Sequence, residues 1–262
     1  MPLGFWEGVV LAMALCSVLS TLAFYKRVLT WDGSVAAFVV GFTIGVLGDI
    51  AWLLILLFFL LSSFLATRYR FALKKAMGVQ EGESGERRSM NVLANGLAPV
   101  GVAVLAALNP PWLPRSVAGV VFLSALAVAG ADTLASEIGV LSRNTVLITT
   151  FRRVAPGTNG GVSALGEAAA LATSLYTAVV GSFVLALAAR QLGLVVTMPA
   201  TFVAFAIPVV VGFVGCQVDS VLGATLEQRG WMDKKTVNLL ATSTGAVLAY
   251  LLVLAYLFPA AA

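Results

Sequence analysis

The feature of this sequence that most constrains its fold is a series of long apolar runs separated by short polar segments. A helix that crosses the hydrocarbon core of a bilayer needs about 20 mostly apolar residues. The second run is short and rich in glycine, so we expect seven or eight transmembrane helices and favour eight. The pattern predicts an all-α fold, a polytopic membrane helical bundle that forms a single integral membrane domain over residues 1–262. The predicted spans cover residues 4–24, 33–48, 50–67, 92–108, 116–137, 163–188, 199–218 and 236–258.

The composition excludes an ordinary soluble domain. Hydrophobic residues make up 60% of the chain and charged residues 11%, and the mean hydropathy is +0.99. A soluble fold of this length could not cover so much apolar surface with a polar shell. The net charge of +4 does not indicate a nucleic-acid partner, because the basic residues lie between the apolar runs and act there as topology signals.

The basic residues predict how the chain is oriented. If the amino terminus lies outside the cell, all but two of the 16 Lys and Arg residues fall on the cytoplasmic side, and only Arg115 and Arg190 lie outside. Cytoplasmic loops normally carry such an excess. This split requires a hairpin at Gly48–Asp49, between the second and third spans. We therefore expect a multi-pass protein of the cell membrane, with membrane lipid around its helices and a homo-oligomer as an open alternative.

The residue types limit the chemistry that the chain can perform. There is no histidine, so the usual general base near neutral pH and the commonest metal ligand are missing. Cys16 and Cys216 both fall inside apolar runs, where neither a disulfide framework nor a thiolate metal site is expected. Gly41 and Gly45 form a small-xxx-small pair, which indicates close contact between helices rather than a ligand site.

Carboxylates inside apolar spans are costly and usually functional. Asp132 and Glu137 lie near the cytoplasmic end of the fifth span, and Asp219 is predicted to end the seventh. On a regular helix Asp132 and Glu137 point about 140° apart, so either the helix distorts there or the two side chains serve different partners. Three acidic residues at one depth are candidate ligands for Mg²⁺, which prefers oxygen. The alternative is carboxylates paired with Arg or with helix amides.

A glycine-rich segment precedes the sixth span. Its glycines and hydroxyl groups can turn backbone N–H groups toward an anion, and the following helix adds its positive end. It is not a Walker A loop, because no Gly-Lys-Ser/Thr follows. A plain loop before a capped helix is the alternative. The candidate phosphate-binding residues here are Arg152, Arg153, Gly157, Thr158, Asn159, Gly160, Gly161 and Ser163.

Amide side chains gather at the same predicted side of the membrane. Asn91 and Asn95 are four residues apart and share one helix face in the fourth span. Asn238 begins a stripe in the eighth span that continues through Thr242 and Gly245. Amides left unsatisfied in lipid are unfavourable, so these must face other helices or a wet cavity. Contacts between helices are the alternative to a role in binding.

The stretch from Arg68 to Lys75 is basic and contains apolar residues. It is predicted either as a helix lying on the inner leaflet or as a basic end of the third span.

Together, the carboxylates, arginines, amides and glycine-rich turn suit a nucleotide polyphosphate with its metal better than a sugar or an apolar solute.

Several motifs, in order along nearly the whole chain, resemble the integral membrane family that includes plant phytyl-phosphate kinase. These motifs are Val92–Gly96, Ala131–Gly139, Pro156–Ser163 and Asp219–Ala224. The resemblance implies a kinase that uses a nucleoside triphosphate, with CTP favoured, to convert an isoprenyl monophosphate to the diphosphate. The sequence departs from the expected pattern at Leu134, Cys216 and Glu167, which puts the pocket shape and the substrate in doubt.

The resemblance also implies roles for the candidate residues. Asp132, Glu137 and Asp219 would hold Mg²⁺, and Arg152 or Arg153 would neutralise charge that develops during transfer. The turn from Gly157 to Ser163 would wrap phosphates, with Ser220 beside it. Asn91, Asn95 and Asn238 would orient phosphates or base, and the prenyl tail would lie in a groove between helices that opens to lipid.

A phosphate monoester is already an anionic nucleophile, so a site without histidine can work by positioning, metal and cationic groups. Two other functions stay open. A cytidylyltransferase of a prenyl lipid would use the same metal–nucleotide site but release pyrophosphate. A transporter of small solutes or ions would also carry acidic residues inside its spans, although usually near the midplane and with repeat symmetry.

Overall fold

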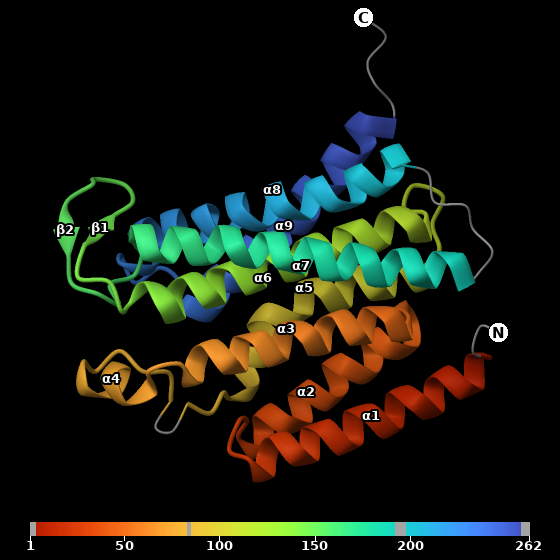
Figure 1. The fold of residues 1–262 in the computed structure, drawn as a ribbon, viewed down its shortest axis with the longest axis horizontal. Coiled ribbons are helices and arrows are strands. Elements are labelled where there is room, and N and C mark those ends of the chain that lie inside the picture. Colours follow the sequence, from red (N-terminus) through yellow and green to blue (C-terminus); the bar gives the residue numbers. More distant parts are fainter. Residues whose placement is uncertain (1–3, 83–84, 192–197, 258–262) are drawn as a thin grey trace, which may run out of the picture.

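The computed structural model describes residues 4–82, 85–191 and 198–257. These residues form eight helices long and apolar enough to cross a membrane, which confirms the favoured count (Figure 1). The α-helices are α1 (Phe5–Tyr25), α2 (Trp31–Thr43), α3 (Ile50–Arg68), α4 (Phe71–Ala76), α5 (Ser89–Leu108), α6 (Arg115–Gly139), α7 (Ala164–Gln191), α8 (Met198–Leu222) and α9 (Lys234–Leu257). Two π-helical turns, η1 (Ile44–Gly48) and η2 (Gly223–Glu227), extend α2 and α8.

The short second run forms a helix of its own. α2 and η1 together are 18 residues long, and α3 begins at Ile50 after a hairpin at the predicted place. The Asp49 carboxylate accepts a hydrogen bond from the backbone N–H of Ala51 and caps the start of α3. Gly45 faces Ala12 of α1, where an added Cβ would lie 2.9 Å from the alanine methyl group, so the predicted close contact between helices is present.

Helix α6 is the central helix of the bundle. It packs against α3, α5, α7, α8 and α9, and it is buried along most of its length. α1, in contrast, is largely exposed and lies at the edge of the bundle against α2 (Figure 1). The stretch of α6 from Val117 to Ala131 is uncharged and buried throughout, so it forms the centre around which the neighbouring helices pack.

Three helices meet at Val128 of α6. An added Cβ at Gly215 of α8 or at Gly245 of α9 would overlap the Val128 side chain. These two glycines let α8 and α9 approach α6 closely, in the way that small residues do in membrane bundles. Asp132 lies one turn further along α6, so this packing sets the position of its carboxylate.

We expect Gly215→Ala to destabilise the protein by about 1–3 kcal/mol, because the new methyl group has no space beside Val128. Thermal unfolding in detergent measures the effect. Gly101→Ala is the matched control, since Gly101 lies in α5 with no atom near its added Cβ and should be neutral or slightly stabilising. Equal melting temperatures for the two variants would contradict the packing argument.

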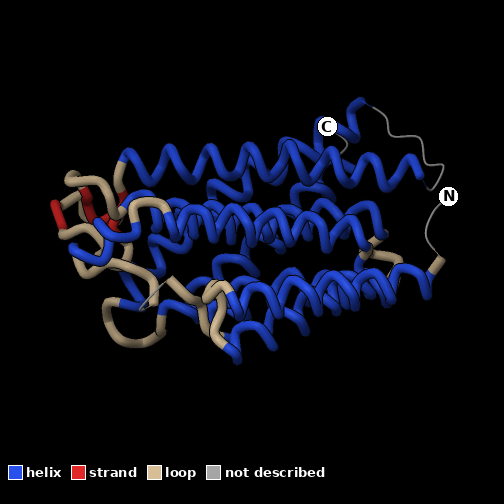
Figure 2. The backbone as a smooth tube through the Cα atoms, turned by 60° about the horizontal axis from the view of Figure 1, so that its bottom comes forward, coloured by secondary structure: helices blue, strands red, loops and turns tan. Residues whose placement is uncertain are grey.

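The strands and longest loops gather at one end of the bundle (Figure 2). There, the segment between α6 and α7 forms a small antiparallel sheet in the order β2-β1-β3, from β1 (Thr145–Leu147), β2 (Arg153–Val154) and β3 (Gly161–Val162). Thr145 pairs with Val154, and Leu147 pairs with Gly161. The sequence predicted a glycine-rich loop here and did not predict the strands.

One further prediction needs correction, and one of the two alternatives for Arg68–Lys75 is excluded. The seventh span continues through η2 to Glu227, so Asp219 lies inside the helix rather than at its end. The basic stretch Arg68–Lys75 is not one amphipathic helix, because Arg70 adopts a left-handed conformation that separates α3 from the short α4. Lys74 of α4 is nevertheless fully buried, and its contacts are described below.

Candidate functional site

A cavity of about 290 Å³ lies at the strand-bearing end of the bundle. Its walls come from the end of α6, the start of α7, the end of α8 with η2, the start of α9, the glycine-rich turn and the connection from α4 to α5. It therefore brings together six segments that are spread along the chain. This is the end that the distribution of charge predicts to be cytoplasmic.

Asp132 and Asp219 face each other in this cavity. Asp132 on α6 and Asp219 on α8 both line it, and their carboxyl groups are close enough to interact electrostatically. The amide nitrogen of Asn238 on α9 donates to Asp132 Oδ2 over 3.3 Å, so this amide orients the carboxylate. Asp219 Oδ2 and Asn238 Oδ1 are buried and find no donor in the described part of the chain. Two carboxylates this close repel each other unless a proton or a cation lies between them.

The oxygen atoms of this pair fit Mg²⁺ in their chemistry. Carboxylate and amide oxygens are hard ligands, and Mg²⁺ in phosphate-handling sites is commonly bound by one or two carboxylates together with water and phosphate oxygens. Among the described residues, no group of three or more acidic, Cys or His side chains is arranged to hold a metal. The assignment of Mg²⁺ to Asp132, Glu137 and Asp219 therefore stays a prediction.

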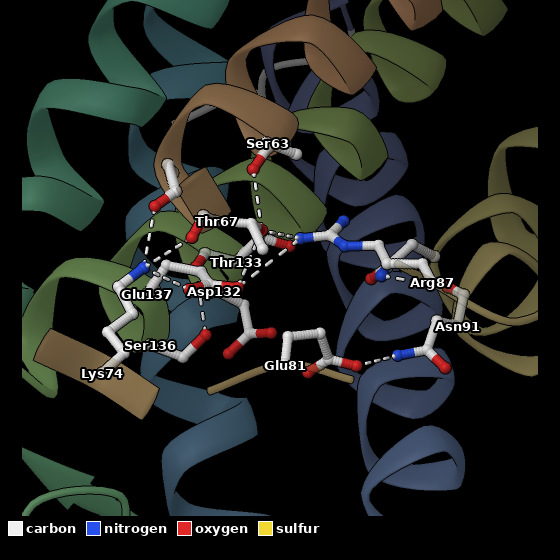
Figure 3. Close-up of polar contacts among 12 residues, drawn as sticks. Ser63, Thr67, Lys74, Glu81, Arg87, Asn91, Asp132, Thr133, Ser136 and Glu137 are labelled. Carbon is white, nitrogen blue, oxygen red and sulfur yellow. Dashed lines mark hydrogen bonds and ion pairs between the residues drawn. The ribbon is translucent and has the colours of Figure 1, made fainter. Parts of the chain in front are cut away.

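Glu137, the third predicted ligand, also lines the cavity, but both of its carboxylate oxygens are bound by other side chains. Its Oε2 accepts from Lys74 Nζ over 2.6 Å, and its Oε1 accepts from Thr67 Oγ1 over 2.8 Å (Figure 3). Arg87 donates to Thr67 Oγ1 over 3.1 Å and lies 4.0 Å from Glu137. α6 is a regular helix here, so the angle of about 140° between Asp132 and Glu137 gives the two carboxylates different partners.

The glycine-rich turn forms the cavity wall opposite α6. Residues 157–163 all line it, together with Ser220, as the sequence grouping anticipated. The side chain of Asn159 donates to Glu227 Oε1 over 2.7 Å, and Gln228 donates to the backbone carbonyl of Asn159 over 2.8 Å. These bonds fix the turn to η2 at the end of α8.

Gly160 is the closest point of that contact. An added Cβ at Gly160 would overlap the backbone of Ala224 in η2, and the backbone φ of Gly160 is +73°, a region that side chains disfavour. Ser163 then caps the start of α7, because its hydroxyl accepts from the backbone N–H of Gly166 over 3.1 Å. The turn is thus shaped by packing against η2 and by the capped start of α7.

The two predicted arginines lie outside the cavity. Arg152 and Arg153 are exposed, and Arg153 belongs to β2, an edge strand of the small sheet. Neither lines the cavity wall, so the structure does not place them where the resemblance assigned them. Their position follows from the strand pairing Val146↔Arg153, which the sequence did not predict.

The predicted asparagines of α5, Asn91 and Asn95, do not line the cavity themselves. Asn91 donates to Glu81 Oε1 over 2.6 Å, and Glu81 lines the cavity (Figure 3). Asn95 donates to the backbone carbonyl of Asn91 and lies deeper in the bundle, with its Oδ1 buried and without a donor in the described residues. Asn91 is therefore connected to the cavity wall, whereas Asn95 is not part of it.

The cavity is more acidic than the sequence indicated. Lys234 is the cationic side chain among the described residues that line it. It lies in the field of Asp132, Glu81, Asp219 and Glu227. Glu167, which was noted only as unusual, accepts from Gln217 over 2.8 Å in the same wall. The lining carboxylates are Glu81, Asp132, Glu137, Glu167, Asp219 and Glu227.

The residues missed by sequence reasoning have weak local signals. Glu81 falls in a polar connection, and Lys234 and Glu227 lie where α8 ends and α9 begins. Their only sequence signal is position, since each is a charged residue in a connection that is predicted to be cytoplasmic. A lining so rich in carboxylates repels a free polyphosphate, which would enter readily only with its metal counter-ions.

The same segments carry the family relationship. A family model described as "Integral membrane protein DUF92" matches residues 14–246. The chain belongs to this DUF92 family of integral membrane proteins. The matched region includes every residue of the site described above. Membership also confirms the predicted resemblance to an integral membrane family that has plant members.

Individual DUF92 relatives match over most of their lengths. An uncharacterized membrane protein of Methanocaldococcus jannaschii is 31% identical over 90% of each chain. "Protein PGR" of Arabidopsis thaliana is 31% identical over 85% of this chain and 80% of its own. "Protein VTE6, chloroplastic" of the same plant is 29% identical over 86% of this chain and 65% of its own. No solved structure matches the chain.

Proposed function

We propose that the protein is a membrane kinase that transfers a phosphoryl group from a nucleoside triphosphate to an isoprenyl monophosphate. Phytyl and geranylgeranyl phosphate are the substrates and CTP is the donor that the resemblance favours. The observation that carries the proposal is the Asp132–Asp219 pair, which faces a glycine-rich turn inside an acidic cavity at one end of the spans. The relationship to "Protein VTE6, chloroplastic" supports the reaction class.

The proposed reaction is balanced without any further reactant. An oxygen of the lipid monophosphate bonds to the γ-phosphorus of the nucleotide, the bond from that phosphorus to the β-bridging oxygen breaks, and the nucleoside diphosphate leaves. The monophosphate is already an anion, so no general base is needed to take a proton. This fits a cavity that contains no histidine.

Asp132 and Asp219 are the residues that would hold Mg²⁺. When bound, the ion would neutralise charge on the phosphate oxygens and orient them. Asn238 holds the Asp132 carboxylate in place, and the glycine-rich turn offers its backbone at the facing wall. Lys234 supplies a positive charge at the start of α9 for a phosphate group.

A site at the end of the bundle suits an amphiphilic substrate. The phosphate would reach the polar cavity while the prenyl tail lies in a groove between helices, open to lipid. With the predicted orientation, the cavity faces the cytoplasm, where nucleotides are available. A transporter usually binds its solute near the membrane midplane, so the position of this cavity favours the kinase.

Product analysis tests the proposal. Purified protein in detergent receives geranylgeranyl or phytyl monophosphate, Mg²⁺ and each nucleoside triphosphate in turn, and mass spectrometry follows lipid and nucleotide. We expect the prenyl diphosphate and the matching nucleoside diphosphate, with chelation of Mg²⁺ by EDTA stopping turnover. A nucleotidyl lipid with pyrophosphate would instead identify a cytidylyltransferase. No turnover by protein shown to be folded would overturn both assignments.

A further inference from the structure

Lys74 is a fully buried lysine at the strand-bearing end of the bundle. Its ammonium group donates to Glu137 Oε2 over 2.6 Å and to the backbone carbonyls of Ala66 and Thr67 over 2.8 and 3.2 Å (Figure 3). Three acceptors therefore satisfy its three donors. The two carbonyls belong to the last turn of α3, so Lys74 joins the end of α3 to the end of α6.

The connection that follows Lys74 forms part of the cavity. Residues 78–81 line it, and the backbone N–H of Val79 donates to the carbonyl of Lys74 over 3.1 Å. The Val79 side chain packs against Gly157 of the glycine-rich turn, where an added Cβ would lie 2.9 Å from the Val79 Cγ1. We call residues 78–81 the α4–α5 wall. This backbone hydrogen bond connects the wall directly to the buried Lys74.

The far side of the α4–α5 wall is tied to α5 and to the α1–α2 connection. Glu81 accepts from Asn91 of α5 over 2.6 Å. The backbone of Arg87 exchanges hydrogen bonds with Val28 and Thr30. The Arg87 side chain reaches Thr67 and Glu137, the same group that holds Lys74. The α4–α5 wall is therefore attached at two places. Glu81 binds Asn91 of α5, and Val79 binds the backbone of Lys74, whose side chain forms the buried ion pair with Glu137.

We propose that Lys74 and Glu137 are positioning residues that hold the α4–α5 wall against the glycine-rich turn and so give the cavity its shape. This deepens the proposed function, on which its catalytic consequence rests, and it removes Glu137 from the metal ligands. Glu137 acts through Lys74, and neither side chain needs to touch the substrate. Both oxygens of Glu137 are already engaged, by Lys74 and by Thr67.

Removing one or both charges of a buried ion pair distinguishes two roles for Lys74 and Glu137: positioning the α4–α5 wall, or only stabilising the fold. Removing one partner leaves an uncompensated buried charge and is strongly destabilising, whereas removing both charges is often nearly neutral. A pair that only balances charge could therefore be replaced without consequence. A pair that anchors the α4–α5 wall could not be replaced in this way, because the wall would lose its attachment even if the global stability of the protein returned.

The test uses hydrogen–deuterium exchange of the full chain in lipid nanodiscs, which reports on the wall without any substrate. The variants are Lys74→Met, the double variant Lys74→Met/Glu137→Gln, and the control Lys75→Met, whose exposed lysine lies next to Lys74. We expect Lys74→Met to lower the melting temperature and raise exchange in residues 78–81 about tenfold or more. Lys75→Met should match the wild type.

The double variant decides between the two roles. We expect its melting temperature to recover toward the wild-type value while exchange in the α4–α5 wall stays high. In the kinase assay, we expect the same variant to show a raised KM for the nucleotide. Recovery of wall protection together with melting temperature, or unchanged exchange in Lys74→Met, would overturn the proposal. Absent turnover in the wild type would overturn the kinase instead, and the exchange result would still decide the role of Lys74.

Discussion

Asp132→Asn and Asp219→Asn are each expected to lower prenyl-phosphate kinase turnover by about 10³-fold, the largest effect that the site predicts. Each substitution keeps the shape of the side chain and removes one carboxylate from the facing pair. With one charge gone, the remaining carboxylate no longer needs a cation beside it, so affinity for Mg²⁺ should fall. Initial rates at saturating nucleotide, measured over a Mg²⁺ series, check both effects.

A readout independent of turnover accompanies this prediction. Wild-type protein should gain thermal stability when Mg²⁺ and nucleotide are added together, by mass action on the folded state, and both variants should gain little. Asp233→Asn is the matched control, because Asp233 is exposed and lies outside the cavity wall. Asp233 accepts from the hydroxyl and N–H of Thr236, which lowers its pKa, and asparagine can take over the same helix cap. Wild-type turnover in Asp132→Asn or Asp219→Asn would remove the metal role.

Gly160→Ala is expected to detach the glycine-rich turn from η2 and to abolish most activity. The new methyl group would overlap the backbone of Ala224, which cannot rotate away as a flexible side chain would. The left-handed backbone at this position adds a cost of about 1–2 kcal/mol for any residue with a Cβ. We expect a total loss of about 3 kcal/mol or more in the free energy of unfolding, or local detachment of the turn at smaller global cost.

Gly230 provides a control with nearly the same backbone. Its φ is +72°, against +73° for Gly160, but no atom lies near its added Cβ. Gly230→Ala therefore carries the backbone cost without the overlap and should keep most activity. Comparing the melting temperature and the nucleotide KM of the two variants separates the backbone strain, which both carry, from the overlap with Ala224, which only Gly160→Ala carries. Equal losses in both would show that the approach of the turn to η2 contributes nothing.

The membrane part of the fold was accessible from sequence because its signals are local. A run of apolar residues of the right length predicts a span wherever it occurs, and the eight predicted spans were found. The hairpin before α3 was predicted because a different span count would reverse the side on which the basic residues fall. Asp49 then provides the cap that such a short turn requires.

The grouping of the site was predicted in part. Asp132, Asp219, Asn238 and the turn at 157–163 do converge, since helix ends on one side of a bundle must meet. The angle between Asp132 and Glu137 already indicated different partners. It did not identify Lys74, because a lysine in a basic stretch is normally solvated, and this one is buried only by the left-handed turn at Arg70.

The sequence by itself determined the class of fold, the number of spans and the end of the bundle where polar residues gather, because hydrophobic length and helical period act within one segment. Only the tertiary structure decided which charges meet. It paired Glu137 with Lys74, left Asp132 facing Asp219, and placed Arg152 and Arg153 outside on the small sheet. Such partners come from distant parts of the chain, and their choice depends on helix rotation and loop path, which hydrophobic patterns leave undetermined.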